Sequence, residues 1–204
     1  MSSDRYYRFL IRAVRFFVRP FHRVAVTGIE RVPQGAVILC PNHSGLLDPF
    51  YVAIAITPRR RGYPMAKKEL ERVPILGRLL KKIEVIFVDR GQADVHAVKA
   101  ALQVLKEDKI LLIFPQGTRV KNGLDKHGEP VTPKDGASLF ATRTGAPLVP
   151  VYIQEKRRLF RSVKVVFGDP YHPQTAERKA TAEELAGITR DLMSRVAALG
   201  EGIG

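Results

Sequence analysis

The chain has 204 residues, of which 45% are hydrophobic, and its 34 lysines and arginines against 20 acidic residues give a formal charge of +14. This length and composition predict one globular domain with a core of its own and exclude a disordered chain. The single cysteine, Cys40, excludes a disulfide framework and cysteine-rich zinc sites. The positive charge indicates an anionic partner, such as nucleic acid, a membrane surface, an acidic carrier protein or a phosphate-bearing substrate.

The first 23 residues combine evenly spaced arginines with many apolar and aromatic residues. Gaps of three and four between the arginines predict a helix over 2–19 with one basic face, which Pro20 ends. A basic face opposite a broad aromatic one is typical of a helix that lies in a membrane interface. The alternatives are a terminal helix docked on the protein's own core and a dimer contact. The arginines are Arg5, Arg8, Arg12, Arg15 and Arg19.

We therefore expect an amphipathic membrane-interface segment over residues 1–23 and a globular domain over residues 24–204. No apolar run reaches the roughly 18 residues that a membrane-spanning helix needs. Arginines also interrupt the apolar residues near the N-terminus, which argues against a secretory signal peptide.

From residue 24 onward, short apolar runs alternate with helical patterns. This order predicts an α/β domain with a mostly parallel mixed sheet flanked by helices. The last two predicted strands, 148–153 and 163–167, are close enough along the chain to pair antiparallel. Pro150 interrupts the first of them and predicts a sheet edge or a kink there. The other predicted strands cover residues 24–30, 36–40, 62–66, 83–88 and 110–114, and the main helices 49–56, 93–106, 136–144 and 181–199.

His43 and Asp48 lie where the predicted strand 36–40 gives way to a helix. Regular helical spacing would turn their side chains about 140° apart. The loop at Ser44 and Gly45 must therefore fold His43 back over the helix start if the two side chains meet, and glycine permits the unusual backbone this needs. A carboxylate bound to one imidazole nitrogen leaves the other nitrogen able to take a proton from a substrate hydroxyl. The alternative is a loop histidine that only caps the helix.

Three further predicted strands end in residues able to bind a phosphate group. Lys67 and Arg90 follow two of them, and Gly117-Thr118-Arg119 follows the buried strand 110–114. Such a turn offers backbone amides, a hydroxyl and a guanidinium to an anion. Because ligands bind at the carboxyl ends of parallel strands, these groups and His43 predict a substrate that carries both a hydroxyl and a phosphate.

Four short motifs follow one another between residues 24 and 167. They are Asn42-His43 with Asp48, then Lys67, Leu70, Gly77 and Arg90, then Phe114-Pro115-Gln116-Gly117-Thr118-Arg119, and finally Val149-Pro150-Val151. In residue type, spacing and order they resemble the motifs of the glycerolipid acyltransferases, and most closely those of the 1-acylglycerol-3-phosphate acyltransferases.

The resemblance implies an enzyme of phospholipid biosynthesis that transfers a fatty acyl group from acyl-coenzyme A or acyl carrier protein to the sn-2 hydroxyl of 1-acylglycerol-3-phosphate. The product would be phosphatidic acid, with no metal or other cofactor required. His43 would act as the general base and Asp48 would orient it. The acceptor phosphate would be bound by Lys67, Arg90, Gly117, Thr118 and Arg119, with Asn42 and Gln116 in supporting roles and Val149 to Val151 along the acyl path.

One residue departs from the family pattern, because Gln116 stands where the family usually has glutamate. Glutamine can still accept a hydrogen bond but carries no charge. If the family carboxylate pairs with an arginine, that pair is weakened here. If it binds the acceptor or a backbone group, glutamine suffices.

The resemblance also implies a peripheral or monotopic protein on the cytoplasmic face of the cell membrane. Within enzymes, the alternative is the same chemistry on glycerol 3-phosphate or another lysolipid. A catalytically silent lipid-binding membrane protein is a different class. Nucleic-acid binding is suggested by charge alone, without interleaved aromatic residues or a recognition motif, and we expect no nucleic-acid partner.

Overall fold

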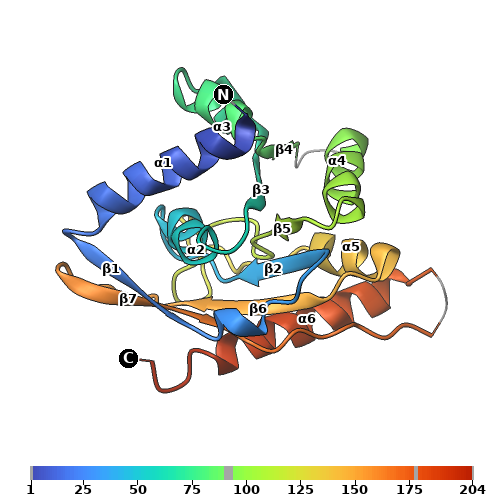
Figure 1. Ribbon diagram of the computed structural model, residues 1–204. Helices are drawn as coiled ribbons and strands as arrows, with labels where there is room; N and C mark the ends of the chain where they lie inside the picture. The colour runs from blue at the N-terminus through green and yellow to red at the C-terminus, as the bar shows by residue number, and fades with distance from the viewer. Residues whose placement is uncertain (1, 90–93, 177–178, 204) are drawn as a thin grey trace.

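The computed structural model describes residues 2–89, 94–176 and 179–203, within which seven strands form one sheet (Figure 1). The order across the sheet is β1-β7-β6-β2-β5-β3-β4, and β6 and β7 form the antiparallel pair while the other neighbours are parallel. This confirms the predicted α/β class and the antiparallel pairing of the last two strands. The strands are β1 His22–Thr27, β2 Val37–Pro41, β3 Gly62–Lys67, β4 Ile86–Val88, β5 Ile110–Leu112, β6 Leu148–Ile153 and β7 Arg161–Phe167.

Helices cover both faces of the sheet. The α-helices are α1 Ser3–Val18, α2 Asp48–Ile56, α3 Leu76–Lys82, α4 Val95–Lys106, α5 Gly136–Thr144 and α6 Ala182–Ala198, with short 3-10 turns at η1 Ile29–Arg31 and η2 Lys68–Arg72. Helix α6 begins with a capping box, in which Thr181 and Glu184 bind each other's backbone N–H groups, as the sequence pattern indicates.

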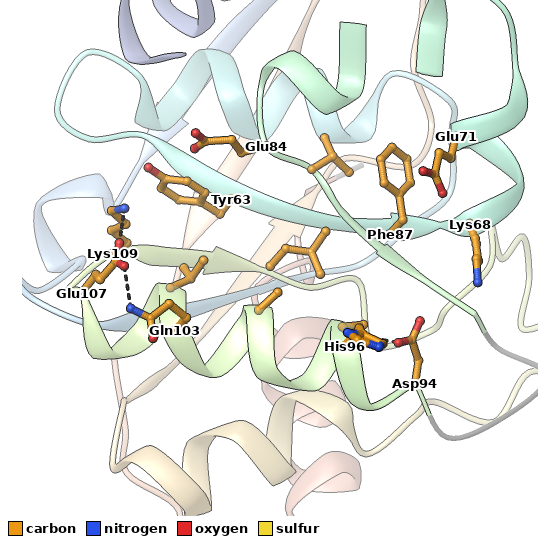
Figure 2. A pocket seen from close by; sticks show the side chains of 15 residues that line it. Tyr63, Lys68, Glu71, Glu84, Phe87, Asp94, His96, Gln103, Glu107 and Lys109 are labelled. Atoms are coloured by element: carbon orange, nitrogen blue, oxygen red, sulfur yellow. Dashed lines mark hydrogen bonds and ion pairs between the residues drawn. The ribbon is translucent and has the colours of Figure 1, made fainter. Parts of the chain in front are cut away.

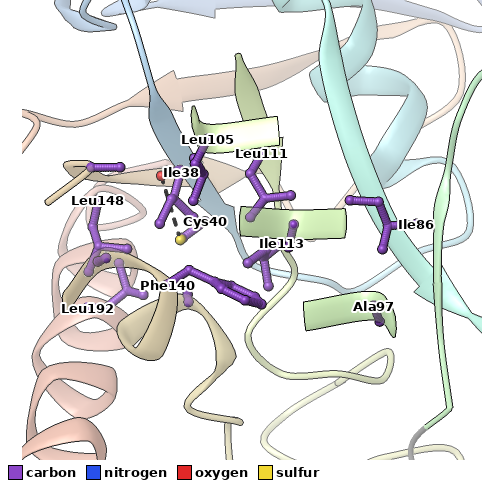
Figure 3. Close-up of a cluster of buried hydrophobic side chains, with 14 of the residues drawn as sticks. Ile38, Cys40, Ile86, Ala97, Leu105, Leu111, Ile113, Phe140, Leu148 and Leu192 are labelled. Atoms are coloured by element: carbon purple, nitrogen blue, oxygen red, sulfur yellow. Dashed lines mark hydrogen bonds between the residues drawn. The ribbon is translucent and has the colours of Figure 1, made fainter. Parts of the chain in front are cut away.

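The central strands are buried on both sides, and alternate residues point to opposite faces. Ile38 and Cys40 of β2 face a core made with α4, α5 and α6 (Figure 3). Val37 and Leu39 face a second core, which α2 closes with Tyr51 and other residues. Strands buried on both faces are characteristic of a parallel sheet covered by helices.

Helix α1 adds a further layer outside α2. Tyr7 and Ile11 are buried and pack with Ala53 and Ile54 of α2. The N-terminal helix is therefore docked along one stripe on the protein's own core, one of the alternatives that the sequence left open. Its other faces remain exposed, and they are considered below.

Pro150 does not mark a sheet edge, so that part of the sequence prediction is wrong. Strand β6 lies inside the sheet, between β7 and β2. Its pairing with β7 covers Val151–Ile153 and begins one residue after Pro150. The carbonyl of Pro150 still accepts a hydrogen bond from the Gly168 N–H, at 2.9 Å. The missing proline N–H therefore removes no bond from the paired part of the β6–β7 ladder.

Candidate active site

The loop between β2 and α2 brings His43 and Asp48 together. His43 Nδ1 lies 2.9 Å from Asp48 Oδ2. Because an ionised carboxylate can only accept, Nδ1 carries the ring proton and Nε2 is the basic nitrogen. The predicted dyad geometry is therefore present, with the His43 side chain 18% exposed and the Asp48 side chain completely buried.

The Asp48 carboxylate is held by backbone groups as well as by His43. Its Oδ2 accepts from the N–H groups of Ser44 and Gly45, each at 2.7 Å. Asp48 is also the first residue of α2, where the helix dipole favours a negative charge. These contacts fix the position of the carboxylate that binds His43.

The loop after β5 encloses the backbone of His43 from both sides. Gln116 Oε1 accepts from the His43 N–H at 2.5 Å, and the Val120 N–H donates to the His43 carbonyl at 2.8 Å. The Phe114 ring lies 4.5 Å from the imidazole, centroid to centroid. Gln116 thus serves as a neutral acceptor for a backbone N–H, which is a role that does not require a carboxylate.

Asn42 ties the same loop to the end of β6. Its side-chain oxygen accepts from the Ile153 N–H at 2.7 Å, and its amide group donates to the Ile153 carbonyl at 3.0 Å and to Glu155 Oε1 at 3.2 Å. The side chain therefore pairs with β6 like an additional strand residue. Asn42 therefore fixes the residue before His43 to β6.

Arg157 is a member of the site that the sequence analysis did not identify. Its guanidinium forms an ion pair with Asp48 Oδ1 from the connection between β6 and β7. A Cβ atom on Gly45 would lie 2.2 Å from Arg157 Nη1. The missing side chain of Gly45 therefore makes room for the guanidinium. The φ of Gly45 is not positive, so the unusual backbone that the sequence analysis expected here is not a left-handed one.

The described members of the predicted phosphate-binding set lie at the same sheet edge but are held less firmly. Lys67 ends β3 and is exposed, and Arg119 is exposed directly before Val120. Gly117 adopts a φ of 69°, and its N–H closes a turn onto the Phe114 carbonyl at 2.9 Å. Thr118 follows in this turn and is half-buried. Arg90 lies outside the described residues.

Val149, Val151 and Cys40 are buried, which bears on what each can do. Val149 and Val151 are fully buried in the core between the sheet and α2, so they do not line an open path for an acyl chain. Burial also raises the pKa of the Cys40 thiol, which makes this residue a packing group rather than a nucleophile. Among the described residues, no group of three or more histidine, cysteine or acidic side chains could hold a metal ion.

A groove of about 710 Å³ opens between β4 and α4 (Figure 2). Apolar residues such as Ile86, Phe87 and Ala97 line it together with charged residues such as Lys68 and Asp94. Neither His43 nor Asp48 lines this groove, so it is separate from the dyad.

Known proteins resemble this chain in sequence and in fold. A family model described as Acyltransferase matches residues 23–154. A 1-acyl-sn-glycerol-3-phosphate acyltransferase of Bacillus subtilis is 34% identical over 93% of this chain and 94% of that protein. A protein of the same name from Helicobacter pylori is 33% identical over 63% of this chain and 52% of its own length.

A solved protein structure has a similar fold. The crystal structure of the 1-acyl-sn-glycerophosphate acyltransferase PlsC from Thermotoga maritima has a TM-score of 0.66 and 23% identity. It covers 97% of this chain and 78% of the Thermotoga chain. Within the described part of the present chain, no helix is both long and apolar enough to cross a membrane.

Proposed function

Because this chain belongs to the acyltransferase family, we propose that it transfers a fatty acyl group to the sn-2 hydroxyl of 1-acylglycerol-3-phosphate, giving phosphatidic acid. The observation that carries the proposal is the His43–Asp48 pair at the carboxyl end of β2, beside a turn able to bind phosphate. The Bacillus relative, similar over nearly its whole length, supports the choice of acceptor.

In the proposed reaction, His43 Nε2 removes the proton from the acceptor hydroxyl as its oxygen attacks the thioester carbonyl. Asp48 stabilises the imidazolium that forms. The C–S bond of the tetrahedral intermediate then breaks, and the imidazolium returns its proton to the leaving thiolate. The products are the new ester and a free thiol, and the donor is acyl-coenzyme A or acyl carrier protein.

We further propose that exposed groups around the dyad bind the acceptor phosphate. Lys67 and Arg119 would supply positive charge, with Arg90 as the third cation expected from the motif. Gly117 and Thr118 would supply a backbone N–H group and a hydroxyl. Lys67 ends β3 and Gly117 to Arg119 follow β5, and both strands end at the same edge of the sheet as β2, which precedes His43. Ligands of parallel sheets bind at this edge.

Membrane association is also a proposal, and it rests on the exposed faces of α1. Phe9, Phe16 and Phe17 are 63%, 73% and 70% exposed, and we call them the aromatic stripe. The helical period places Phe9 and Phe16 beside the five arginines and opposite the docked residues Tyr7 and Ile11, with Phe17 farther round the helix. Aromatic residues next to exposed arginines suit the boundary between lipid acyl chains and anionic headgroups.

A second exposed apolar group lies next to the end of α1. Leu159 and Phe160, in the connection between β6 and β7, are 65% and 75% exposed. The Phe160 N–H donates to the Phe21 carbonyl at 2.7 Å, and the two rings lie 6.3 Å apart. We propose that this pair extends the membrane-contacting surface and brings the dyad close to the lipid acceptor.

The direct test is acyl transfer from oleoyl-coenzyme A to 1-acylglycerol-3-phosphate in detergent micelles, with His43→Ala as the control. Product from the wild type but not from the variant supports the proposal. If neither protein forms product, the assay is repeated with oleoyl-acyl carrier protein. Failure with both donors would favour another acceptor, which glycerol 3-phosphate and other lysolipids would test, or a silent lipid-binding protein.

Flotation with vesicles containing phosphatidylglycerol tests the membrane surface. A Phe16→Ser/Phe17→Ser double variant should float less than the wild type, whereas Leu124→Ser, at another exposed apolar residue, should float like the wild type. Point variants are sharper than deletion of α1, because Tyr7 and Ile11 also cover α2. Equal flotation of all three proteins would contradict the proposed surface.

A further inference from the structure

Arg157 lies near the centre of the site, although it is 109 positions from Asp48 and belongs to none of the four motifs. We propose that Arg157 is a positioning residue for the catalytic dyad, which holds Asp48 in place and balances its charge during proton transfer. This inference rests on the proposed function, because it concerns the same His43–Asp48 pair.

The two oxygens of Asp48 have separate partners. Oδ2 receives His43 and the two backbone N–H groups, and Oδ1 receives Arg157. With Arg157 on Oδ1, the carboxylate cannot rotate without breaking an ion pair. The guanidinium therefore keeps Oδ2 directed at the imidazole.

Several contacts with the protein fix the position of the Arg157 side chain. Its Nε donates to the Gln154 carbonyl at 2.7 Å, and its Nη2 donates to Ser44 Oγ at 2.9 Å as well as to Asp48. The guanidinium lies over the Tyr51 ring, 5.2 Å from its centroid, and the side chain is 14% exposed. A cation with its donors already directed at protein acceptors is poorly placed to bind the acceptor phosphate, unlike exposed Arg119.

Arg157 also places a positive charge beside the dyad. Asp48, from α2, favours the imidazolium, and Arg157, from the β6–β7 connection, opposes it by neutralising Asp48. Other titratable groups near the dyad include Tyr51, which faces Arg157, and Tyr152, which lies near Arg157 and Glu155; burial is the main cause of the raised pKa of each tyrosine. Glu155 itself binds Asn42. Loss of the guanidinium should therefore let His43 take up a proton at higher pH.

The test compares Arg157→Gln, Arg157→Lys and wild type, with Lys156→Gln as a matched loss of charge from the same connection. Lys156 is exposed. For Arg157→Gln we expect kcat to fall by about 10- to 100-fold, as for other residues that orient a functional histidine, with the KM for the acceptor nearly unchanged. In the pH profile of kcat/KM, the acid limb should shift to higher pH by about one unit. Arg157→Lys should leave that limb in place, and Lys156→Gln should match the wild type.

Two results would overturn the inference. An increase in KM with unchanged kcat and acid limb would make Arg157 a phosphate ligand. A lower kcat with an unmoved acid limb would reduce it to a structural residue. Circular dichroism and thermal unfolding check that each variant folds.

Two further measurements keep the inference testable if Arg157→Gln does not fold or the substrate differs from the one proposed. Gly45→Ala should displace the guanidinium without removing it, because the added Cβ overlaps Nη1, and should move the acid limb in the same direction. The NMR titration of the His43 ring needs no substrate, and its signal is identified by its loss in His43→Ala. An unchanged titration midpoint in Arg157→Gln or Gly45→Ala would overturn the inference, whereas a shifted midpoint without acyl transfer would contradict the proposed function alone.

Discussion

The dyad at the end of β2 and the proposed phosphate-binding residues differ in how firmly the protein holds them. Asp48 is completely buried, and its carboxylate binds His43, two backbone N–H groups and Arg157. Lys67 and Arg119 are exposed at the rim of the same sheet edge. In the proposed reaction, the dyad is therefore in place before substrate binds, whereas Lys67 and Arg119 would meet the phosphate only when the acceptor arrives. Changes in the first region should lower kcat, and changes in the second should raise KM.

The largest loss of activity is expected from His43→Ala, which removes the base from the firmly held region. A general base contributes about 10²- to 10⁴-fold, and we expect kcat to fall by that amount. The bond to Gln116 is made by the His43 backbone and survives the substitution. Steady-state kinetics should therefore show the loss while the melting temperature stays close to that of the wild type. A large drop in melting temperature would mean that the ring is mainly structural.

Asp48→Asn should lower activity less than His43→Ala but should cost more stability. The asparagine oxygen can still accept from His43 and from the Ser44 and Gly45 N–H groups. Its NH₂ group would then face Arg157, leaving that cation without its buried partner, which costs about 3–5 kcal/mol in other proteins. We expect kcat to fall by about 10- to 100-fold. Urea unfolding measures the stability, and an unchanged midpoint would show that the ion pair adds nothing.

The same contrast explains what the sequence could predict. The His43–Asp48 contact spans five residues, so strand and helix patterns were enough to show that the loop would have to fold back for the two side chains to meet. The boundaries of α5 also depend on local sequence and were predicted, and the capping box of α6 follows from the spacing of Thr181 and Glu184. The reach of Arg157 across 109 positions has no periodicity or spacing to reveal it. In the sequence, Gly45 is related to this contact, because its missing side chain makes room for the guanidinium. Only the fold shows that Arg157 lies there.

Pro150 and Gln116 also depend on contacts with distant parts of the chain, which the sequence alone does not show. The effect of a proline depends on where the neighbouring ladder begins, and that depends on the register between β6 and β7. The sequence left two roles open for residue 116. The structure favours the second, because Gln116 accepts from a backbone N–H. Residue type alone could not decide this, since glutamate and glutamine offer the same acceptor oxygen.

In the exposed region, Arg119→Ala should weaken binding of the acceptor without disturbing the dyad. Loss of one charge-assisted hydrogen bond to a phosphate is worth about 1.5–3 kcal/mol, or roughly a 10- to 100-fold increase in KM. The kcat at saturating acceptor and the melting temperature should stay near the wild-type values. Lys67→Ala should behave in the same way. A fall in kcat with an unchanged KM would place Arg119 with the dyad instead of with the phosphate.

The smallest effect is expected from Gln116→Glu, which restores the residue usual in the family at the border between the two regions. Because the His43 N–H needs one acceptor oxygen, either side chain can supply it, and kcat/KM should change by less than about threefold, within 1 kcal/mol. Gln116→Leu tests the same contact from the other side. Gln116→Leu leaves the backbone N–H of His43 without its acceptor, which should lower the stability by about 1–3 kcal/mol. If Gln116→Glu instead raised activity tenfold or more, the charge at this position would matter through a partner other than the backbone, and the neutral role inferred from the 2.5 Å contact would be wrong.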